Sequence, residues 1–334
     1  RLVYLYFRLP VSVTTGYHTQ SGRFNNFKML FTVVFHPRLL EGLKMTCRHM
    51  TLAADKSLLS KLRKKTGYSL MNCKKALEKF ENNIDQAEKW LSELAQKEGW
   101  AKASKLQGRP MSQGLVGLIH DKSSATLLEV NCETDFVARN DKFRSLVTQV
   151  THILHKNFSN GDQKKVGLDA SALSSIPVEG GKILADIVAL HVGNIGENMS
   201  LRRASYLRAN ASSILGTYVH SSGEKIEVDN CKLGRYGAIV EVGQAGEVRE
   251  SNLPIDVVAL QVCQHIVGSN PKKIGSSEDK PEEDKDNETK LLFQEFVIDP
   301  DLTVKEFLEN NSAVVWDFVR IECGEELNEK SSDK

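Results

Sequence analysis

Hydrophobic residues recur at the three- and four-residue spacing of a helix in three consecutive stretches of the chain. The stretches are DKSLLSKLRKKTG, LMNCKKALEKF and IDQAEKWLSELAQKEG, and each has a single apolar face. Gly67 can adopt the left-handed conformation that ends the first helix, and Ser69 can cap the second. The pattern predicts a small three-helix domain in residues 55–104.

Alternating apolar and polar residues, typical of β-strands, follow this domain. GLVGLIHDKSSATLLEVNCE (114–133) predicts two strands around a polar turn, with Leu128, Val130 and Cys132 on one face. Helical spacing returns after Asn140, which is a suitable N-cap. This part of the chain therefore predicts an antiparallel hairpin followed by a helix.

The same order of elements returns later in the chain. ILGTYVHSSGEK and RYGAIVEVG predict a second hairpin, and LPIDVVALQVCQHIVG predicts a helix with Pro254 in its first turn and Gly268 at its end. Between the two copies, GGKILADIVALHVGNIGENM predicts a helix and SLRRASYL a strand. We therefore expect an α+β fold with two related subdomains, residues 105–209 and 210–330, each an antiparallel sheet with packed helices.

The C-terminal part alternates between charged and apolar segments. NPKKIGSSEDKPEEDKDNETK (270–290) is nearly devoid of apolar residues, so we expect this acidic loop to be disordered. LLFQEFVIDPD predicts a strand, and Thr303 with Glu306 has the pattern of a capping box. AVVWDFVRIEC predicts the last strand of the second sheet, with four residues on one face: Val315, Val319, Ile321 and Cys323.

Residues 1–54 differ from the rest of the chain in charge. They contain seven lysines and arginines, and Glu41 is their only acidic residue. A basic, hydroxyl-rich segment that is poor in acidic residues is typical of an organelle transit peptide. The alternative interpretation is a disordered tail or translated upstream sequence.

Charge and cysteine content narrow the function classes. A net charge of +1 over 334 residues gives no global field that points to nucleic acid or a membrane. The longest apolar stretch, MLFTVVF, is far too short to span a bilayer. The six cysteines form no C-x-x-C pair and no zinc-ligand spacing, so we expect buried free thiols in a reducing compartment and no metal site.

Motifs of known active sites are absent from the sequence. It contains no G-x-x-x-x-G-K-[ST], no G-x-G-x-x-G after a strand, no G-x-S-x-G and no H-E-x-x-H. Without a constellation of nucleophile, base or metal ligands, the sequence favours a binding protein over an enzyme, and we expect no cofactor.

The junction NCETDFVARND (131–141) places an aromatic residue, Phe136, on a turn between the first hairpin and its helix. The corresponding junction of the second subdomain, GQAGEVRESN, has no aromatic residue, so such a turn does not require one. If Asp135 caps the helix, a hydrophobic staple would join positions 134 and 139, which are threonine and arginine. Phe136 is therefore either buried by tertiary contacts or exposed as an anchor for a partner.

Six stretches between about Lys56 and Glu329 carry a family resemblance: LRKKTGYSLMNCKKALEK, QAEKWL, EVNCETDFVARND, NIGENMSLRR, ILGTYVH and FVIDPDLTVKEFL. They resemble elongation factor Ts in its mitochondrial form. The resemblance implies a guanine-nucleotide exchange factor that binds elongation factor Tu with GDP and promotes GDP release during translation in the mitochondrial matrix. It also implies a three-helix domain like the ubiquitin-associated domain, no direct nucleotide binding and no catalysis.

The resemblance further implies which residues contact elongation factor Tu. Asp135 and Phe136 match the exchange motif, in which the phenylalanine inserts near the partner's magnesium and nucleotide site. The other matching residues are Ile195 and Gly196, which support this contact; Arg63, Leu70, Met71 and Lys74 in the N-terminal domain; and His220, Val297 and Ile298, which meet the partner's last domain. Bacterial members carry a long helical hairpin where this chain has its acidic loop, a departure that supports the mitochondrial form.

Two other functions stay open from the residues alone. The basic first helix would suit a nucleic-acid-binding module, although near-neutral net charge and the lack of interleaved aromatic residues argue against one. The three-helix domain would suit a ubiquitin-type adaptor, which would leave the two subdomains without a role.

Overall fold

The computed structural model describes residues 53–327 apart from Gly67, Ser69, Gln107, Ser222, Glu224, Val248, Ser251 and Ser277. The expected transit segment, except for its last two residues, lies outside the described residues. The two predicted helix-end residues of the first domain, Gly67 and Ser69, lie outside them as well.

Three helices form the N-terminal domain, in agreement with the apolar spacing: α1 (Lys56–Thr66), α2 (Leu70–Lys79) and α3 (Ile84–Leu106). Their apolar faces meet in a small core that includes Leu62, Leu77 and Leu91. The many lysines stay on the outside of this core, which explains why the basic residues of α1 do not disturb its packing.

Helix α3 is longer than its sequence pattern predicts, because its second half packs against α7 (Leu184–Ile195). The two backbones approach so closely at Gly99 that a Cβ atom there would lie 1.7 Å from the carbonyl oxygen of Ala189. Gln96 and Trp100 donate hydrogen bonds to Asp186 of α7 at 2.9 and 3.1 Å. Tertiary packing therefore extends a helix that its own periodicity would end earlier.

A six-stranded antiparallel sheet follows, with the strand order β3-β6-β2-β1-β9-β8. Its strands are β1 (Gln113–His120), β2 (Ser124–Cys132), β3 (Lys165–Asp169), β6 (Met199–Arg208), β8 (Ile226–Val228) and β9 (Cys231–Gly234). The pairing of Gln113 with Cys132 and of His120 with Ala125 confirms the predicted first hairpin.

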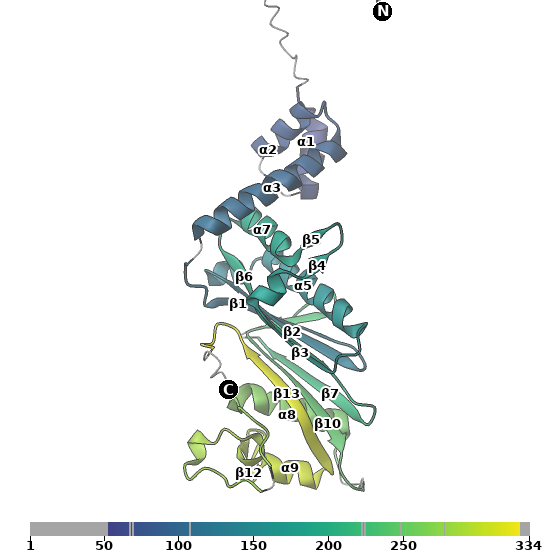
Figure 1. The fold of residues 1–334 in the computed structure, drawn as a ribbon, viewed down its shortest axis with the longest axis vertical. Helices are drawn as coiled ribbons and strands as arrows, with labels where there is room; N and C mark the ends of the chain where they lie inside the picture. Colours follow the sequence, from purple (N-terminus) through teal and green to yellow (C-terminus); the bar gives the residue numbers. More distant parts are fainter. Residues whose placement is uncertain are drawn as a thin grey trace, which may run out of the picture. The chain divides into compact units, whose positions relative to one another are not determined.

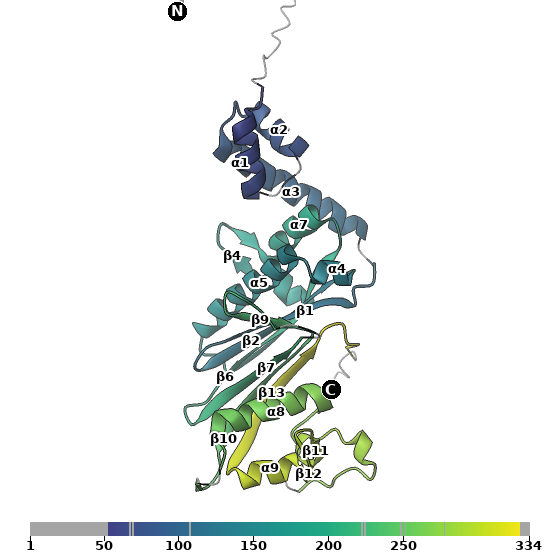
Figure 2. The same ribbon diagram turned by 180° about the vertical axis from the view of Figure 1, so that it is seen from behind.

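Helices α5 (Asp141–Ser159) and α7 cover one face of this large sheet (Figure 2). Asn140 caps α5 by accepting a hydrogen bond from the Lys142 backbone N–H, as the sequence predicts. Leu128 and Val130 of β2 pack against this layer with Phe143 of α5. Smaller elements complete it: α4 (Asp135–Ala138), α6 (Ala170–Ser174) and the hairpin β4 (Pro177–Val178) and β5 (Lys182–Ile183).

A three-stranded antiparallel sheet, in the order β13-β10-β7, forms the second layer. Its strands are β7 (Ser213–His220), β10 (Tyr236–Gln244) and β13 (Ala313–Glu322). Its outer face carries α8 (Ile255–Ser269), α9 (Val304–Asn310), the 3-10 turn η3 (Leu291–Phe293), and the hairpin β11 (Glu295–Phe296) and β12 (Asp299–Thr303). The 3-10 turn η2 (Lys285–Asn287) lies between α8 and η3 in the chain. The capping box of Thr303 and Glu306 is present at the start of α9.

The ends of α8 differ slightly from the prediction. Pro254 is the N-cap residue just before the helix and not part of its first turn. The helix continues past Gly268, and Asn270 takes the left-handed conformation at its C-terminal end, with φ of 49°.

The two sheets pack face to face through a third cluster of apolar side chains. Leu118 and Leu127 of the large sheet meet Leu215, Ile239 and Ile321 of the small sheet there. The order of layers is helices, large sheet, small sheet, helices (Figures 1 and 2). Strands β1 and β2 are therefore buried on both faces, which explains their nearly continuous apolar sequence.

Two strands of the expected second subdomain belong to the sheet of the first, which the repeat pattern does not predict. Strands β8 and β9 belong by sequence to the expected second subdomain, but β9 pairs with β1 of the large sheet, Gly234 opposite Val116. A division of the chain at residue 210 therefore does not separate the two sheets.

A β-bulge in β13 contradicts the prediction that Val315, Val319, Ile321 and Cys323 share one face. Glu241 pairs with Asp317 and Val242 with Val315, so Trp316 is an extra residue between them. The extra residue reverses the alternation, because side chains change sides at every position. Val315 packs toward α8, whereas the other three pack between the sheets.

The acidic loop 270–290, expected to be disordered, has defined contacts in its described part. Lys290 pairs with Glu282 and Glu288 at 2.8 and 3.7 Å, and its side chain is only 10% exposed. The Lys272 N–H donates to the Thr289 carbonyl. Ion pairs and backbone hydrogen bonds stabilise this segment, although it buries few apolar side chains. The strand expected over LLFQEFVIDPD is replaced by η3 and the hairpin β11–β12.

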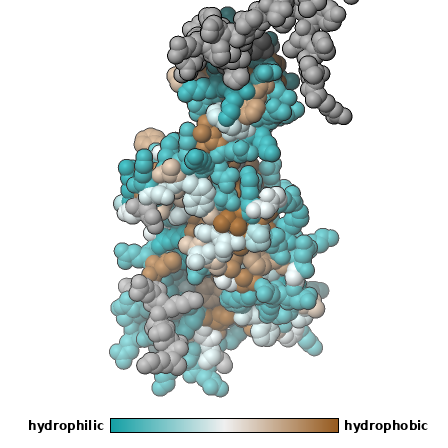
Figure 3. All heavy atoms as spheres, turned by 45° about the horizontal axis from the view of Figure 1, so that its top comes forward, coloured by the Kyte–Doolittle hydropathy of each residue, from teal (hydrophilic) through white to brown (hydrophobic). Residues whose placement is uncertain are grey.

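The face of the molecule shown in Figure 3 is mostly hydrophilic, with apolar patches scattered between polar side chains. Within the part of the chain that the structure describes, every helix is too short or too polar to cross a bilayer.

Candidate functional site

The turn after β2 is built around Thr134. This residue, and not Asp135, is the N-cap of α4, with extended backbone angles of φ −126° and ψ 154°. Its hydroxyl accepts a hydrogen bond from the Val137 N–H at 3.3 Å and donates one to Glu197 Oε2 at 2.8 Å. The same side chain thus starts the short helix and ties it to a distant part of the chain.

The residues around Phe136 are all held in place. Asp135 forms an ion pair with Arg139 one turn later, at 3.0 Å. Val137 is only 5% exposed and packs into the core over the large sheet. The side chain before Phe136 and the side chain after it therefore fix the direction in which the aromatic ring leaves the turn.

Phe136 itself is 79% exposed, the highest value of any large apolar side chain in the described residues. This observation decides between the two interpretations left open by the sequence: the ring is not buried by tertiary contacts. Exposure of a full aromatic surface to water is unfavourable in an isolated domain. An aromatic ring on a rigid, capped turn has the properties of an interface anchor.

The end of α7 lies next to this turn. Gly196 closes the helix in the left-handed conformation, with φ of 93°, and Ile195 is partly buried against the core. The loop that follows carries Glu197 and Asn198, and the Asn198 N–H donates to Glu133 Oε1 at 3.1 Å. Two of the residue pairs named from the resemblance, 135–136 and 195–196, are therefore joined by a polar network.

Sequence reasoning missed the residues that form this network. Glu197 binds Thr134, and Glu133 binds both Asn198 and Arg109, the latter at 3.2 Å. A threonine three residues before a buried valine is a recognisable N-cap signal, but the glutamate 63 residues away has no local signature.

The turn lies next to a buried thiol. Cys132 is fully buried, and burial raises the pKa of its thiol to about 12. Five cysteines of the described residues are free and buried, as expected from the sequence, while Cys47 lies outside those residues. No group of three or more metal-ligating side chains occurs in the described part of the chain.

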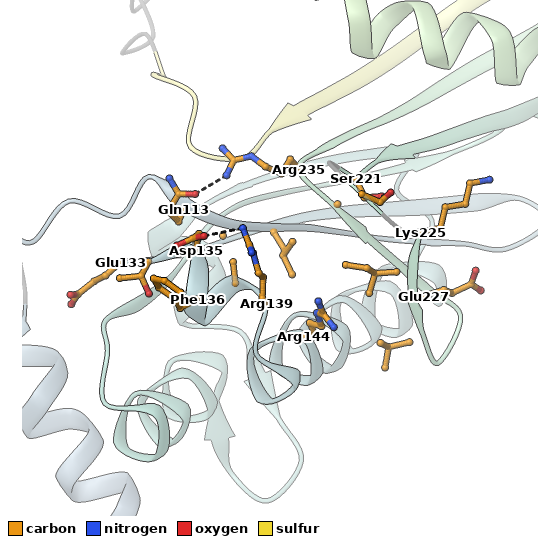
Figure 4. A pocket seen from close by; sticks show the side chains of 18 residues that line it. Gln113, Glu133, Asp135, Phe136, Arg139, Arg144, Ser221, Lys225, Glu227 and Arg235 are labelled. Carbon is orange, nitrogen blue, oxygen red and sulfur yellow. Dashed lines mark hydrogen bonds and ion pairs between the residues drawn. The ribbon is translucent and has the colours of Figure 1, made fainter.

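An open cleft of about 1230 Å³ borders Phe136 (Figure 4). The α4 turn contributes Asp135 and Arg139 to one side, and the segment around Lys225 and Glu227 forms another. Arg235 reaches into it from the start of β10 and donates to Gln113 at 2.9 Å. Charges of both signs line the cleft, so it suits a polar protein surface better than a simple anion.

The N-terminal candidates form an exposed group on two helices. Arg63 lies on α1, and Leu70, Met71 and Lys74 lie on the first turns of α2. Leu70 and Met71 are 52% and 66% exposed. Two adjacent exposed apolar side chains with lysines around them form a small amphipathic surface.

The remaining candidates lie on the side of the small sheet. His220 is exposed at the end of β7, and its ring lies near those of Tyr218 and Tyr236. Val297 and Ile298 form the exposed tip of the β11–β12 hairpin, at 55% and 46%. The His220 carbonyl accepts a hydrogen bond from the Arg235 N–H at 2.9 Å, and Arg235 lines the cleft beside Phe136. The named residues thus come from the N-terminal domain, from the elements around the cleft and from the β11–β12 hairpin.

Comparison with known proteins identifies the family of the chain. The family model "Elongation factor Ts, mitochondrial, N-terminal" matches residues 43–101, and the model "Elongation factor TS" matches residues 133–291. The first match begins inside the segment expected to be a transit peptide. A mitochondrial elongation factor Ts from Aedes aegypti is 45% identical over 280 residues, which cover 82% of this chain and 90% of the relative.

The chain belongs to the mitochondrial elongation factor Ts family. Mitochondrial elongation factors Ts from Xenopus laevis and Homo sapiens are 44% and 42% identical, over 84% and 82% of this chain and 90% and 84% of their own lengths. The resemblance drawn from the motifs is therefore confirmed. Elongation factor Ts is the nucleotide exchange factor of elongation factor Tu in mitochondrial translation, which confirms the expected function and a mitochondrial location.

Proposed function

We propose that this chain binds mitochondrial elongation factor Tu with GDP bound and promotes GDP release by inserting Phe136 into the partner. The proposal places this event in the mitochondrial matrix. The observation that carries it is the 79% exposure of Phe136 on a turn whose other residues are capped, paired or buried.

The physical basis is reciprocal coupling between two binding events. A factor that binds the nucleotide-free partner more tightly than the nucleotide-bound partner must weaken nucleotide binding by the same free energy. Burial of a phenylalanine side chain contributes about 1.5–3 kcal/mol, and this energy is available only when the partner opens a place for the ring. Phe136 would displace elements that position the partner's magnesium ion and phosphates.

Because the turn is rigid, more of the free energy from burying the Phe136 ring contributes to binding. The Thr134 cap, its bond to Glu197 and the Asp135–Arg139 pair hold the ring in one orientation before binding. A preorganised anchor loses less conformational entropy on association than a mobile one. Asp135 would keep the turn in shape or exchange its bond to Arg139 for a bond to the partner.

The other named residues would enlarge the contact. Leu70 and Met71 present apolar surface from the N-terminal domain, while Val297 and Ile298 present it from the β11–β12 hairpin. Each pair is exposed and apolar, which suits a protein interface. Contact with water makes such a pair unfavourable in the isolated chain, and burial against the partner would remove this contact. The chain needs no bound nucleotide and carries out no covalent step in this mechanism, so we propose a binding protein and not an enzyme.

Release of fluorescent GDP from mitochondrial elongation factor Tu tests the proposal. The wild-type chain should accelerate release, and Phe136→Ala should lose most of this acceleration while its thermal unfolding midpoint stays unchanged. Trp316→Ala is the matched control, because it removes another exposed aromatic ring, 55% exposed, from strand β13 of the small sheet. Equal acceleration by Phe136→Ala and wild type would contradict the role of the ring, and no acceleration by the wild type would contradict the function.

A further inference from the structure

A carboxylate lies fully buried in the middle of β2, seven residues before Phe136. Glu129 is 0% exposed. Its Oε1 accepts hydrogen bonds from Arg202 Nη1 at 3.1 Å and from the Gly324 N–H at 2.7 Å, and its Oε2 accepts one from Arg203 Nε at 2.8 Å. A buried charge is tolerated only when it is paired and hydrogen-bonded in this way.

A β-bulge allows two consecutive arginines to reach the same carboxylate. Glu129 pairs with Arg203 and the next residue, Val130, pairs with Leu201, so Arg202 is an extra residue in β6. In a regular strand, neighbouring side chains point to opposite faces. The bulge removes this alternation and brings both guanidinium groups to Glu129.

The ion pairs extend from these arginines to the C-terminal end of β13. Arg203 also binds the Glu325 carboxylate and donates to the Glu322 carbonyl at 3.1 Å. Arg320 pairs with Glu325 at 3.2 Å and with Glu322 at 2.8 Å. The six residues Glu129, Arg202, Arg203, Arg320, Glu322 and Glu325 balance three negative charges with three positive ones, and are called the charge clamp below.

Burial by itself would raise the pKa of the Glu325 carboxyl, but the hydrogen bond from Arg203 and the charges of Arg203 and Arg320 outweigh this effect and lower the pKa. Glu325 is therefore ionised at neutral pH and keeps both arginines in place.

The charge clamp contacts the elements that carry the Phe136 turn and the Val297–Ile298 tip. Glu129 lies on the strand that leads directly into the Phe136 turn. At the other end, Arg320 Nε lies 3.4 Å from the Val267 carbonyl of α8, and the next residue of that helix, Gly268, lies beneath the Val297 side chain. His265 of the same helix accepts a hydrogen bond from the Val297 N–H at 3.3 Å.

We propose that the charge clamp is a positioning device, which holds the Phe136 turn and the Val297–Ile298 tip at a fixed separation so that both engage elongation factor Tu at once. This inference rests on the proposed function and adds residues that touch no partner. Two linked contacts strengthen each other only when their spacing matches the partner, because the second contact then forms at high effective concentration. Removal of one partner from a buried ion pair leaves an uncompensated charge and typically costs about 3–5 kcal/mol, so the test must separate loss of geometry from loss of folding.

Spin-label distance measurements test the geometric part. Labels at Lys142→Cys, close to the Phe136 turn, and at Asp301→Cys, close to the hairpin tip, are placed on the full chain with Cys47→Ser. The distance distribution should be narrow in this background and broader when Glu325→Gln or Glu129→Gln is added. Glu325→Gln decides the question if Glu129→Gln does not fold, because the Glu325 side chain is partly exposed and lies at the outer end of the clamp.

Exchange kinetics test the functional part. The clamp variants should need about tenfold more factor for half-maximal GDP release, with a maximal rate within about twofold of wild type. Asp317→Asn is the matched control, because it breaks another ion pair between the two sheets, Lys165–Asp317 at 2.7 Å, away from the clamp. An unchanged distance distribution, or a broad one with unchanged half-maximal concentration, would overturn the inference. The distance measurement needs no partner, so it stands apart from a failure of the exchange function itself.

Discussion

Thr134 Oγ1 donates a hydrogen bond to Glu197 Oε2 at 2.8 Å, and this bond joins the end of β2 to the loop after α7. The two residues are 63 positions apart in the chain. Their contact places the loop of Gly196 beside the turn of Phe136, so two motifs that are distant in sequence act as one surface. Glu197 therefore supports the turn that carries the aromatic ring through the N-cap residue of its helix.

Thr134→Val should lower the exchange rate roughly five- to tenfold, because it removes both the cap of α4 and the bond to Glu197, and a helix N-cap contributes about 1 kcal/mol. Thr134→Ser keeps the hydroxyl and should behave like the wild type. GDP release measured at several factor concentrations provides the comparison. A valine variant as active as the serine variant would show that Phe136 needs no fixed turn.

Replacement of Val297 and Ile298 together by serine should weaken the complex with elongation factor Tu about tenfold, or about 1.4 kcal/mol, because two exposed apolar side chains would be lost from the interface. The folded chain should keep its stability, since neither side chain is buried. Calorimetric binding to the nucleotide-free partner measures the effect. Asp301→Asn, on the same hairpin and also exposed, is the control and should leave affinity unchanged.

His191 on α7 should make stability depend on pH. Burial, assisted by the charge of Lys142, lowers the pKa of its imidazole from 6.5 to about 4. The unfolded chain binds a proton near pH 6.5 and the folded chain only near pH 4, so its contribution to stability is complete above pH 6.5 and is lost as the pH falls toward 4.

Urea unfolding at pH 7 and pH 5 measures this dependence. The decrease in unfolding free energy between the two pH values should be smaller in His191→Leu than in the wild type. Nδ1 of His191 has no hydrogen-bond partner among the described residues, so the leucine variant should not be less stable at pH 7. An equal decrease in both proteins would assign the pH dependence to other groups.

Gly99→Ala should push α3 away from α7, because the added Cβ would meet the Ala189 carbonyl oxygen at 1.7 Å. Overpacking of this kind typically costs about 1–3 kcal/mol. Hydrogen exchange of the second half of α3 should increase. Gly268→Ala, another helical glycine whose nearest neighbour would be 3.8 Å away, is the matched control and should be tolerated. Unchanged protection in Gly99→Ala would show that the close crossing is not needed.

The local sequence pattern predicted most of the helices and strands of this protein correctly. The three N-terminal helices, the first hairpin, the Asn140 cap and the Thr303–Glu306 capping box all follow from spacings of two to four residues. Such spacings record which face of an element is buried, and they are set by neighbours along the chain. The family was also readable from short motifs, because those motifs are contiguous.

The local sequence pattern did not predict the β-bulges at Arg202 and Trp316. A bulge adds one residue without changing the composition of its strand, so the alternation before and after it still looks regular. Only the pairing of β13 with β10 shows that Val315 and Val319 point to opposite sides of the sheet.

The sequence by itself determined the elements, the α+β class, the family and the choice of Phe136 as the residue to question. Tertiary structure decided that the ring is exposed, that β9 joins the sheet of β1, and that Glu129 meets Arg203 and Gly324. The physical reason is distance along the chain. Helix and strand periodicity arises among residues a few positions apart, whereas exposure and ion pairing depend on partners that folding brings together from far away.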